Sequence, residues 1–244
     1  MDRFAETIFA KLRVAVALPL LAAGCANMDT YRADYPEPND RLDHVLALYK
    51  LNLEDGKECH DILRPRSETG DCARLLSELD RLVMEFPSHG RILLANAVLS
   101  YEAGRTEVAQ AMLDRLLGQG SSHPEAAILR ARIALEQGNV SGAVHLLERQ
   151  TMLAPGNLEL RSALASAYYA SGDYARARNL LLTPGMDSHE PWEHAYHLGL
   201  LAEAEEDWQG ACERYRQALG HRADFVPARA RIIGLTRYAP CAAP

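Results

Sequence analysis

Cysteine is the residue type here with the most chemistry to explain, because it can be acylated, oxidised to a disulfide or bound to a metal. The 244 residues contain five cysteines: Cys25, Cys59, Cys72, Cys212 and Cys241. An odd number cannot pair completely, so one thiol is either free or chemically special. No Cys-x-x-Cys spacing occurs, which argues against a zinc site.

Other residue patterns that could do chemistry are few. The sequence has no Gly-rich phosphate loop, no Gly-x-Ser-x-Gly and no His-Glu-x-x-His. His194 and His197 are three residues apart, a spacing that can chelate a metal on one helix face, although such histidines are more often solvated or packed at a repeat boundary. No pattern sets a nucleophile beside an oriented base. The sequence therefore predicts no catalytic residue, no cofactor and no metal, and we expect no enzyme.

The N-terminus has the pattern of an export signal. Arg3, Lys11 and Arg13 make it positive, and the stretch 14–23 is uncharged and apolar. That stretch is too short to span a bilayer, which takes about 20 apolar residues, but it fits a secretory signal. Small residues then lead into Cys25, in the order Leu-Ala-Ala-Gly-Cys.

These residues resemble the lipobox of bacterial lipoproteins, in which the peptide is cut before the cysteine and the thiol is acylated. The match departs at Ala22, where the family usually has Leu. The resemblance implies that Cys25 carries a lipid anchor, and Ala26 in place of Asp favours the outer membrane. We therefore expect a protein anchored on the periplasmic face of the outer membrane of a Gram-negative bacterium. The alternatives are an ordinary cleaved signal with an incidental cysteine, or an internal start codon.

A tether and a helix are expected next. Residues 25–39 lack hydrophobic periodicity, and Pro36 and Pro38 disfavour a helix there. Asp40 could cap a helix that runs to Glu54. Its apolar residues follow helical spacing and need a partner surface: Leu42, Val45, Leu46, Tyr49 and Leu53.

The rest of the chain repeats every 34 residues, in frames that start at Gly90, Pro124, Leu158 and Trp192. Position 8 of each frame is small (Ala97, Ala131, Ala165 and Gly199), and position 20 is always alanine (Ala109, Ala143, Ala177 and Ala211). Position 15 is Gly104, Gly138, Gly172 and then Glu206. Small residues allow two helices to approach closely, and glycine permits the left-handed backbone that ends a helix. The repeats therefore predict stacked helix pairs.

These columns resemble the tetratricopeptide repeat (TPR), with Leu198-Gly199, Gly172-Asp173-Tyr174 and Pro155 at characteristic positions. The resemblance implies an all-α fold, a right-handed superhelical solenoid of antiparallel helix pairs with a C-terminal capping helix. The expected divisions are a signal peptide (1–24), a tether (25–39), an N-terminal helix with a degenerate repeat (40–89), four repeats (90–123, 124–157, 158–191 and 192–225) and a capping helix with tail (226–244). Repeat three is expected to break at Thr183-Pro184-Gly185.

If Cys25 is acylated, four cysteines remain, and an even number in an exported chain suggests disulfides. Three connectivities are available. We favour Cys59–Cys72, within the degenerate repeat, and Cys212–Cys241, between the last full helix and the segment after the cap. Each would staple one end of the array. The alternative is that these cysteines are buried or free thiols.

The TPR resemblance also implies a concave face, or groove, lined by positions 2, 5, 9, 12 and 13 of each first helix. The aromatic, apolar and basic residues at these positions are the predicted partner-binding groove: Leu94, Val98, Tyr101, Ile128, Arg132, Leu135, Tyr169, Tyr196 and Leu200. Glutamates at positions 2 and 13 add a carboxylate fringe. The alternative is that some of these side chains pack on the helix 40–54.

The net charge of −7 argues against a general nucleic-acid binder, which needs a basic face. A protein partner with apolar anchors and basic flanks fits better, and no small-molecule substrate is expected. The chain looks like the TPR lipoproteins that assist assembly of a pilus, a secretin or an outer-membrane complex. The alternative is a periplasmic adaptor or regulator of a cell-wall enzyme.

Overall fold

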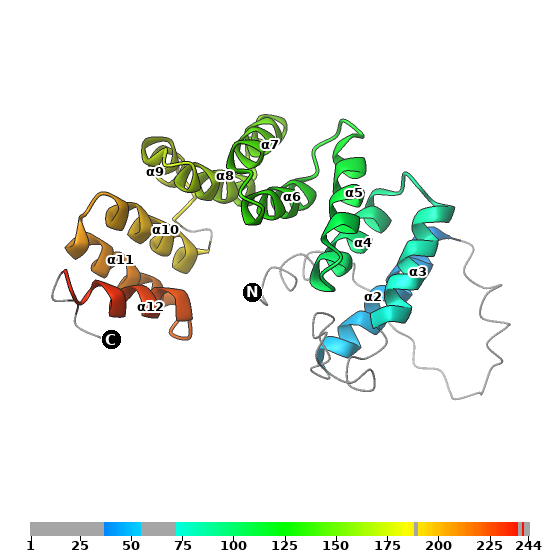
Figure 1. Ribbon diagram of the computed structural model, residues 1–244, viewed down its shortest axis with the longest axis horizontal. Coiled ribbons are helices and arrows are strands. Elements are labelled where there is room, and N and C mark those ends of the chain that lie inside the picture. Colours follow the sequence, from blue (N-terminus) through cyan, green and yellow to red (C-terminus); the bar gives the residue numbers. More distant parts are fainter. Residues whose placement is uncertain (1–36, 55–71, 188–189, 239–240, 242–244) are drawn as a thin grey trace. The chain divides into compact units, whose positions relative to one another are not determined.

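The computed structural model describes residues 37–54, 72–187, 190–238 and 241. This part of the chain is all helical, without a strand, which confirms the expected fold class (Figure 1). The helices are α2 (Pro38–Glu54), α3 (Cys72–Glu85), α4 (Gly90–Glu102), α5 (Thr106–Leu117), α6 (Pro124–Glu136), α7 (Val140–Leu153), α8 (Leu158–Ala170), α9 (Tyr174–Leu181), α10 (Pro191–Ala204), α11 (Trp208–His221) and α12 (Val226–Leu235).

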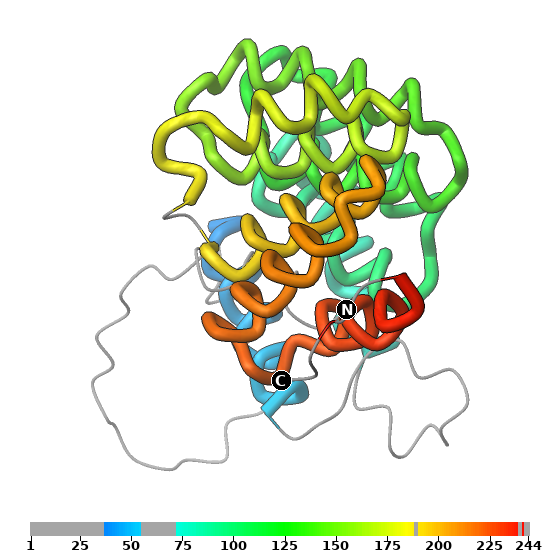
Figure 2. The backbone as a smooth tube through the Cα atoms, turned by 90° about the vertical axis from the view of Figure 1, so that its left-hand side faces the viewer, coloured from blue at the N-terminus to red at the C-terminus, as the bar shows by residue number. Residues whose placement is uncertain are grey.

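The chain divides into two units, residues 1–120 and 121–244. Within unit 1, α2 packs against α3, and α4 packs against both α3 and α5. Unit 2 contains the pairs α6–α7, α8–α9 and α10–α11, and α12 packs on α11. The two helices of such a pair lie side by side, as Figure 2 shows for α10 and α11. The first helices begin at the frame starts, apart from α10, which begins one residue early at Pro191.

The turns inside the pairs have the backbone that the glycine column predicted. Gly104, Gly138 and Gly172 have φ values of +73°, +75° and +79°, in the left-handed region that glycine enters without cost. Glu206, at the same repeat position, adopts φ +62° despite its side chain. Three second helices then start on a side-chain cap, and Asn139, Asp173 and Asp207 each accept a backbone N–H three residues ahead.

The small columns lie where the helices touch. The four alanines at position 20 are at most 1% exposed. At position 8 of the last repeat, a Cβ added to Gly199 would lie 2.5 Å from the ring of Tyr215, which is itself fully buried. The column is therefore small because a neighbouring helix occupies the space.

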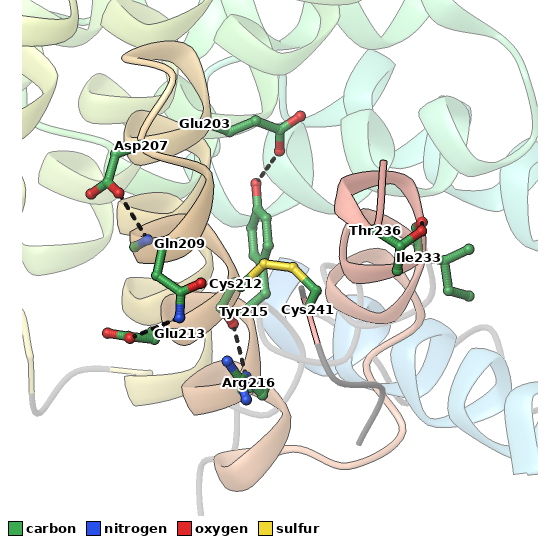
Figure 3. The surroundings of a disulfide bond; sticks show 11 residues. Glu203, Asp207, Gln209, Cys212, Glu213, Tyr215, Arg216, Ile233, Thr236 and Cys241 are labelled. Atoms are coloured by element: carbon green, nitrogen blue, oxygen red, sulfur yellow. Dashed lines mark hydrogen bonds between the residues drawn. A yellow bond between two sulfur atoms is a disulfide. The ribbon is translucent and has the colours of Figure 1, made fainter. Parts of the chain in front are cut away.

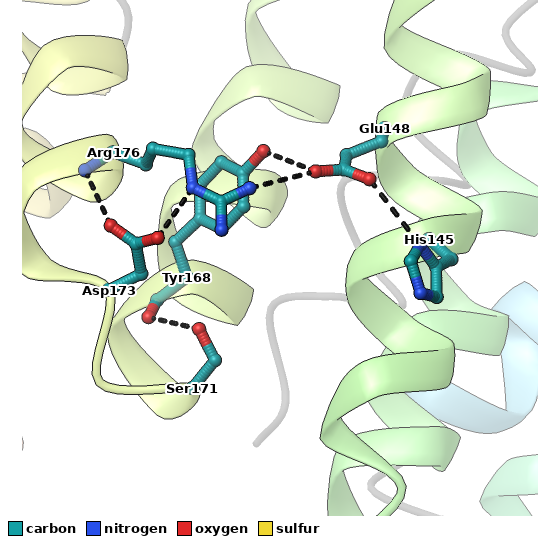
Figure 4. A network of polar contacts seen from close by, with 6 residues as sticks. All are labelled: His145, Glu148, Tyr168, Ser171, Asp173 and Arg176. Carbon is teal, nitrogen blue, oxygen red and sulfur yellow. Dashed lines mark hydrogen bonds and ion pairs between the residues drawn. The ribbon is translucent and has the colours of Figure 1, made fainter.

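A polar network joins α7, α8 and α9 (Figure 4). Glu148 accepts a hydrogen bond of 2.6 Å from the Tyr168 hydroxyl and one of 3.2 Å from Arg176. Arg176 also donates to Asp173 at 2.5 Å, and its guanidinium lies 4.5 Å from the centre of the Tyr168 ring. One carboxylate thus connects the second helix of one repeat to both helices of the next.

The N-terminal helix differs from the expectation in its start. We expected Asp40 to cap it, but α2 begins at Pro38 and Asp40 lies within its first turn. Proline is tolerated at that place because the first N–H groups of a helix have no partner within it. Leu42, Val45 and Tyr49 are buried, as their spacing predicted.

Helix α2 is paired with α3 rather than separate from the repeats. Arg41 donates to Glu78 at 2.9 Å and also bonds to Glu85, both on α3. The first helix of the expected degenerate repeat falls mainly on residues 55–71, and the signal peptide, Cys25 and most of the tether on residues 1–36. All of these lie outside the described residues.

The C-terminal end carries a disulfide between Cys212 of α11 and Cys241, whose Cα atoms are 5.7 Å apart (Figure 3). Both half-cystines belong to a core cluster with Tyr215, Ile232 and Leu235. The bridge therefore holds the segment after α12 against α11. Cys59 lies outside the described residues, so its pairing with Cys72 stays a prediction.

Helix α9 ends at Leu181, as expected from the Thr-Pro-Gly break that follows it. Within the described part of the chain, no helix is both long enough and apolar enough to cross a membrane.

Candidate functional site

In unit 1, the predicted groove positions of α4 are partly covered. Arg91, at position 2, donates to Asn39 at 2.8 Å and to Asp43 at 2.7 Å, both on α2. Glu102, at position 13 of α4, accepts a hydrogen bond from Tyr49 of α2. Helix α2 thus contacts both ends of the groove face predicted for α4. This agrees with the alternative that part of the groove packs on the helix predicted over residues 40–54.

The three predicted groove residues of α4 are exposed to different degrees. Leu94 and Tyr101 are half-buried, whereas Val98 is only 3% exposed. A partner needs accessible side chains, so Val98 belongs to the packing of unit 1 and not to its surface.

In unit 2, all six predicted groove residues are half-buried, which leaves part of each side chain accessible. They come from three first helices: Ile128, Arg132 and Leu135 from α6, Tyr169 from α8, and Tyr196 and Leu200 from α10. Arg132 donates to Glu136 at 3.2 Å one turn further along α6. Unit 2 is therefore the stronger candidate for a binding surface.

Aromatic contacts hold Tyr196 in place. Its ring lies edge-on to Phe225 at 5.1 Å and 5.6 Å from Tyr215. Trp192 packs edge-on to Phe225 at 4.7 Å, and the guanidinium of Arg222 lies 4.7 Å from the centre of the Trp192 ring. An aromatic side chain fixed in this way loses little entropy when a partner packs on it.

Glu203, at position 12 of α10, is the centre of a second cluster. It accepts hydrogen bonds from the Tyr215 hydroxyl at 2.6 Å and from Arg231 at 3.1 Å. Burial and then the hydrogen bond to Glu203 raise the pKa of Tyr215 above its ordinary value. Burial also raises the pKa of Tyr169. Both phenols therefore stay neutral at physiological pH and act as hydrogen-bonding groups only.

A cavity of about 60 Å³ lies between α8, α9 and α10. Its buried lining comes from Ala165, Ala177, Leu181 and Leu201, and its half-buried lining from Ser166, Tyr169, His197 and Leu200. Ser166, Tyr169 and Leu200 occupy groove positions 9 and 12, so the cavity opens onto the predicted groove. Of its lining residues, Tyr169 and Leu200 belong to the predicted partner-binding set, and Ser166 occupies a predicted groove position.

Three residues with polar side chains line this cavity, namely Ser166, Tyr169 and His197. The Ser166 hydroxyl donates to the backbone oxygen of Ser162 at 3.1 Å and lies 3.3 Å from His197 Nε2. His197 Nδ1 is buried without a hydrogen-bond partner. Burial lowers the pKa of His197 below its ordinary value of 6.5, although nearby Glu193 opposes this. The imidazole is therefore neutral near pH 7.

Serine next to histidine is a combination that nucleophilic catalysis uses, but catalysis also needs the base to be held by a third group. His197 Nδ1, the atom that such a group would hold, makes no hydrogen bond. His194 and His197 were the sequence's only hint of a metal. Within the described ranges, no group of three or more His, Cys, Asp or Glu residues could hold one.

A row of glutamates lies at position 2 of the first helices of unit 2: Glu125, Glu159 and Glu193. All three are half-buried, and Glu193 accepts a hydrogen bond of 2.9 Å from Ser162 of α8. Because the row follows the repeat period, it gives one end of the three first helices a consistent negative charge. We call these three residues the glutamate row.

Comparisons with known proteins agree with this architecture. Two tetratricopeptide repeat models match, one over residues 94–157 and the other over residues 134–203. No curated protein matches the sequence significantly.

Among solved structures, TTC0263, a thermophilic TPR protein of Thermus thermophilus, is 15% identical with a TM-score of 0.59. The alignment covers 82% of this chain and 100% of that one. YrrB, described as a TPR protein with an unusual peptide-binding site, is 13% identical with a TM-score of 0.57, covering 83% and 95%. Residues 41 to the end of MamA from Desulfovibrio magneticus RS-1 are 16% identical with a TM-score of 0.56, covering 76% and 98%. At these identities the likeness shows a shared all-α TPR fold.

Proposed function

We propose, on the basis that this is a tetratricopeptide repeat protein, that it is a lipid-anchored scaffold of the bacterial envelope that binds a protein partner through the groove of unit 2. TPR proteins are generally scaffolds rather than enzymes, and the proposed role requires no catalysis. The partner belongs to an assembling machine such as a pilus, a secretin or an outer-membrane complex.

The proposal that the protein binds a partner rests on the accessibility of the groove side chains in unit 2. Six predicted groove residues from three successive first helices remain partly accessible, and aromatic packing fixes Tyr196 among them. A few well-packed side chains, most often Trp, Tyr and Arg, supply most of the affinity in protein interfaces. YrrB, which shares the fold, is described as having a peptide-binding site.

The anchor part rests on the N-terminal sequence. Cys25 follows a positive segment and a short apolar stretch, in the order typical of a lipoprotein signal. Acyl chains contribute about 0.8 kcal/mol per buried CH₂, so several chains on one cysteine would hold the domain at the membrane. The tether, predicted over residues 25–39, would then link the lipid to α2, which begins at Pro38.

Two experiments test these parts separately. Labelling of cells with a radioactive fatty acid should mark the wild-type protein and not the Cys25→Ala variant. If Cys25→Ala retained the label, the proposed lipid anchor and the membrane location inferred from it would be wrong. The proposed binding through the groove would be unaffected.

For the groove, the partner should be crosslinked in intact cells and identified by mass spectrometry. Ile128→Glu with Leu135→Glu, on α6, should abolish the crosslink. Met152→Glu is the matched control, because Met152 is 74% exposed and lies on the second helix of the same repeat. Recovery of a cell-wall enzyme would favour the adaptor role over machine assembly. Equal crosslinking by all variants would contradict binding through this groove.

A further inference from the structure

The volume of the cavity beside Ser166 matches the end of one aliphatic side chain. An empty apolar cavity of about 150 Å³ is large enough to bind benzene, which has six carbon atoms. By proportion, the cavity of about 60 Å³ has room for two or three carbon atoms. The branched end of valine, isoleucine or leucine has that size.

The lining selects an apolar group. Ala165, Ala177, Leu181 and Leu201 offer only carbon atoms, so a charged group placed against them would lose its hydration without compensation. Ser166 and His197 already lie within hydrogen-bonding distance of each other. An aliphatic side chain therefore leaves their contact intact, whereas it gains burial against the apolar base.

The glutamate row sets the second preference. Glu159 and Ser166 are seven residues apart on α8, as are Glu193 and Leu200 on α10. Seven residues of α-helix rise about 10 Å, and an extended peptide covers that distance in about three residues. A basic side chain at that spacing from the aliphatic anchor would reach the glutamates.

We propose that unit 2 recognises an extended peptide segment that places Val, Ile or Leu in the cavity and Lys or Arg, about three residues away, at the glutamate row. This inference rests on the proposed function and specifies the partner by its chemistry. The cavity supplies the anchor, and the row of carboxylates fixes the direction and register of the segment.

A phage-displayed library of random linear peptides, selected on the full chain in mild detergent, tests the inference. Enriched peptides should share a branched aliphatic residue with Lys or Arg about three residues away. A synthetic peptide of the enriched sequence should bind at least about tenfold more weakly when its aliphatic residue is changed to alanine. Unchanged binding would overturn the inference, whatever the variants of the protein do.

The protein variant for the same test is Ser166→Leu, which fills the cavity. Val98 and Leu200 occupy this repeat position in other first helices, so the fold accommodates a large aliphatic side chain there. Ser141→Leu, an exposed position in the first turn of α7, is the matched control. Ser166→Leu should lose at least about tenfold in affinity, and Ser141→Leu should bind like the wild type.

The outcomes separate this inference from the proposed function. Peptides that bind Ser166→Leu as well as the wild type would overturn the cavity as anchor, but would leave the groove as a binding surface. Peptides enriched without Lys or Arg, or unaffected by the combined change Glu125→Gln, Glu159→Gln and Glu193→Gln, would overturn the role of the row. No enriched peptide at all would contradict both this inference and peptide binding by the groove.

Discussion

Gly199 shows at the scale of one residue how the helix pair α10–α11 limits its own sequence. A Cβ at this position would meet Tyr215 ring atoms at 2.5 and 2.7 Å, and Tyr215 is fully buried and hydrogen-bonded to Glu203. The ring cannot move without disturbing both its packing and this hydrogen bond.

We therefore expect Gly199→Ala to destabilise unit 2 by about 1–3 kcal/mol, the usual cost of overpacking. Gly220→Ala is the control, because its added Cβ would have no neighbour within 4 Å and the residue lies within α11. That change should be neutral or stabilise by about 0.5–1 kcal/mol. Urea denaturation of both variants measures the difference, and equal free energies of unfolding would contradict the packing explanation.

His194 and His197 should make stability depend on pH. Burial holds the pKa of each below the ordinary value of 6.5. Asp187 opposes this shift at His194, and Glu193 opposes it at His197. As pH falls below about 6.5, the unfolded chain takes up protons that the folded chain does not, so stability decreases.

The double variant His194→Gln, His197→Gln should therefore lose less stability than the wild type between pH 7 and about pH 5. Denaturant titrations at both pH values measure this, and His221→Gln, an exposed position at the end of α11, is the control. A pH dependence that is the same in the double variant and the control would show that these histidines are not its source.

At the scale of elements, α12 and the segment after it depend on the disulfide. The bridge between Cys212 and Cys241 closes a loop with a sequence separation of 29 residues. The chain-entropy model assigns roughly 3–4 kcal/mol to a loop of that length. Without the bridge, this end would be held by non-covalent contacts alone: the packing of α12 on α11, the hydrogen bond from Arg231 to Glu203 and the stacking of Tyr238 on Trp208.

Cys212→Ala with Cys241→Ala should consequently lower the free energy of unfolding of unit 2 by up to that amount. The effect should be largest at the C-terminal end, so amide hydrogen exchange should accelerate in α12 more than in α6 or α7. Treatment with a reductant should reproduce the faster exchange of α12 in the wild type and leave the exchange of α12 in the double variant unchanged. Equal protection of α12 in both proteins would contradict a stapling role.

The helix pairs from α4 onward could be predicted from sequence because each repeated column has its own physical cause. The alanines at position 20 are buried between helices, and the glycines at position 15 adopt positive φ. The pairing of α2 with α3 could not be predicted, since residues 55–71 interrupt the period between them. The burial of Val98 could not be predicted either, because the repeat register gives the position of a residue on its helix and not what packs against it.

The groove positions of unit 2 could also be named from the repeat register, but the cavity could not. It is lined by Ala165, Ala177 and Ser166, and Ser166 stands where the other repeats have the larger residues Val98, Arg132 and Leu200. A column of side chains reveals which of them are small. Whether neighbouring helices fill the space depends on packing that only the structure shows.

At the scale of the whole molecule, charge should control how quickly a basic partner arrives. The chain has a formal net charge of −7, and the glutamate row concentrates negative charge at one end of the first helices of unit 2. Such a field raises the association rate of a cationic ligand and is screened by salt over about 8–10 Å at physiological ionic strength. The cavity, by contrast, acts through apolar contact, which salt of this concentration hardly changes.

The glutamate row should therefore act mainly on the association rate constant, and the cavity mainly on the dissociation rate constant. For a peptide with an aliphatic anchor and a basic residue, the association rate constant should fall several-fold from low to high NaCl, while the dissociation rate constant changes little. Combining Glu125→Gln, Glu159→Gln and Glu193→Gln should flatten the salt dependence, whereas Ser166→Leu should raise the dissociation rate and keep that dependence. Stopped-flow fluorescence measures both constants. A filled cavity cannot weaken a long-range electric field, so Ser166→Leu should not slow association. If Ser166→Leu did slow association and the triple variant kept the salt dependence, the assignment of steering to the glutamate row and of anchoring to the cavity would be wrong.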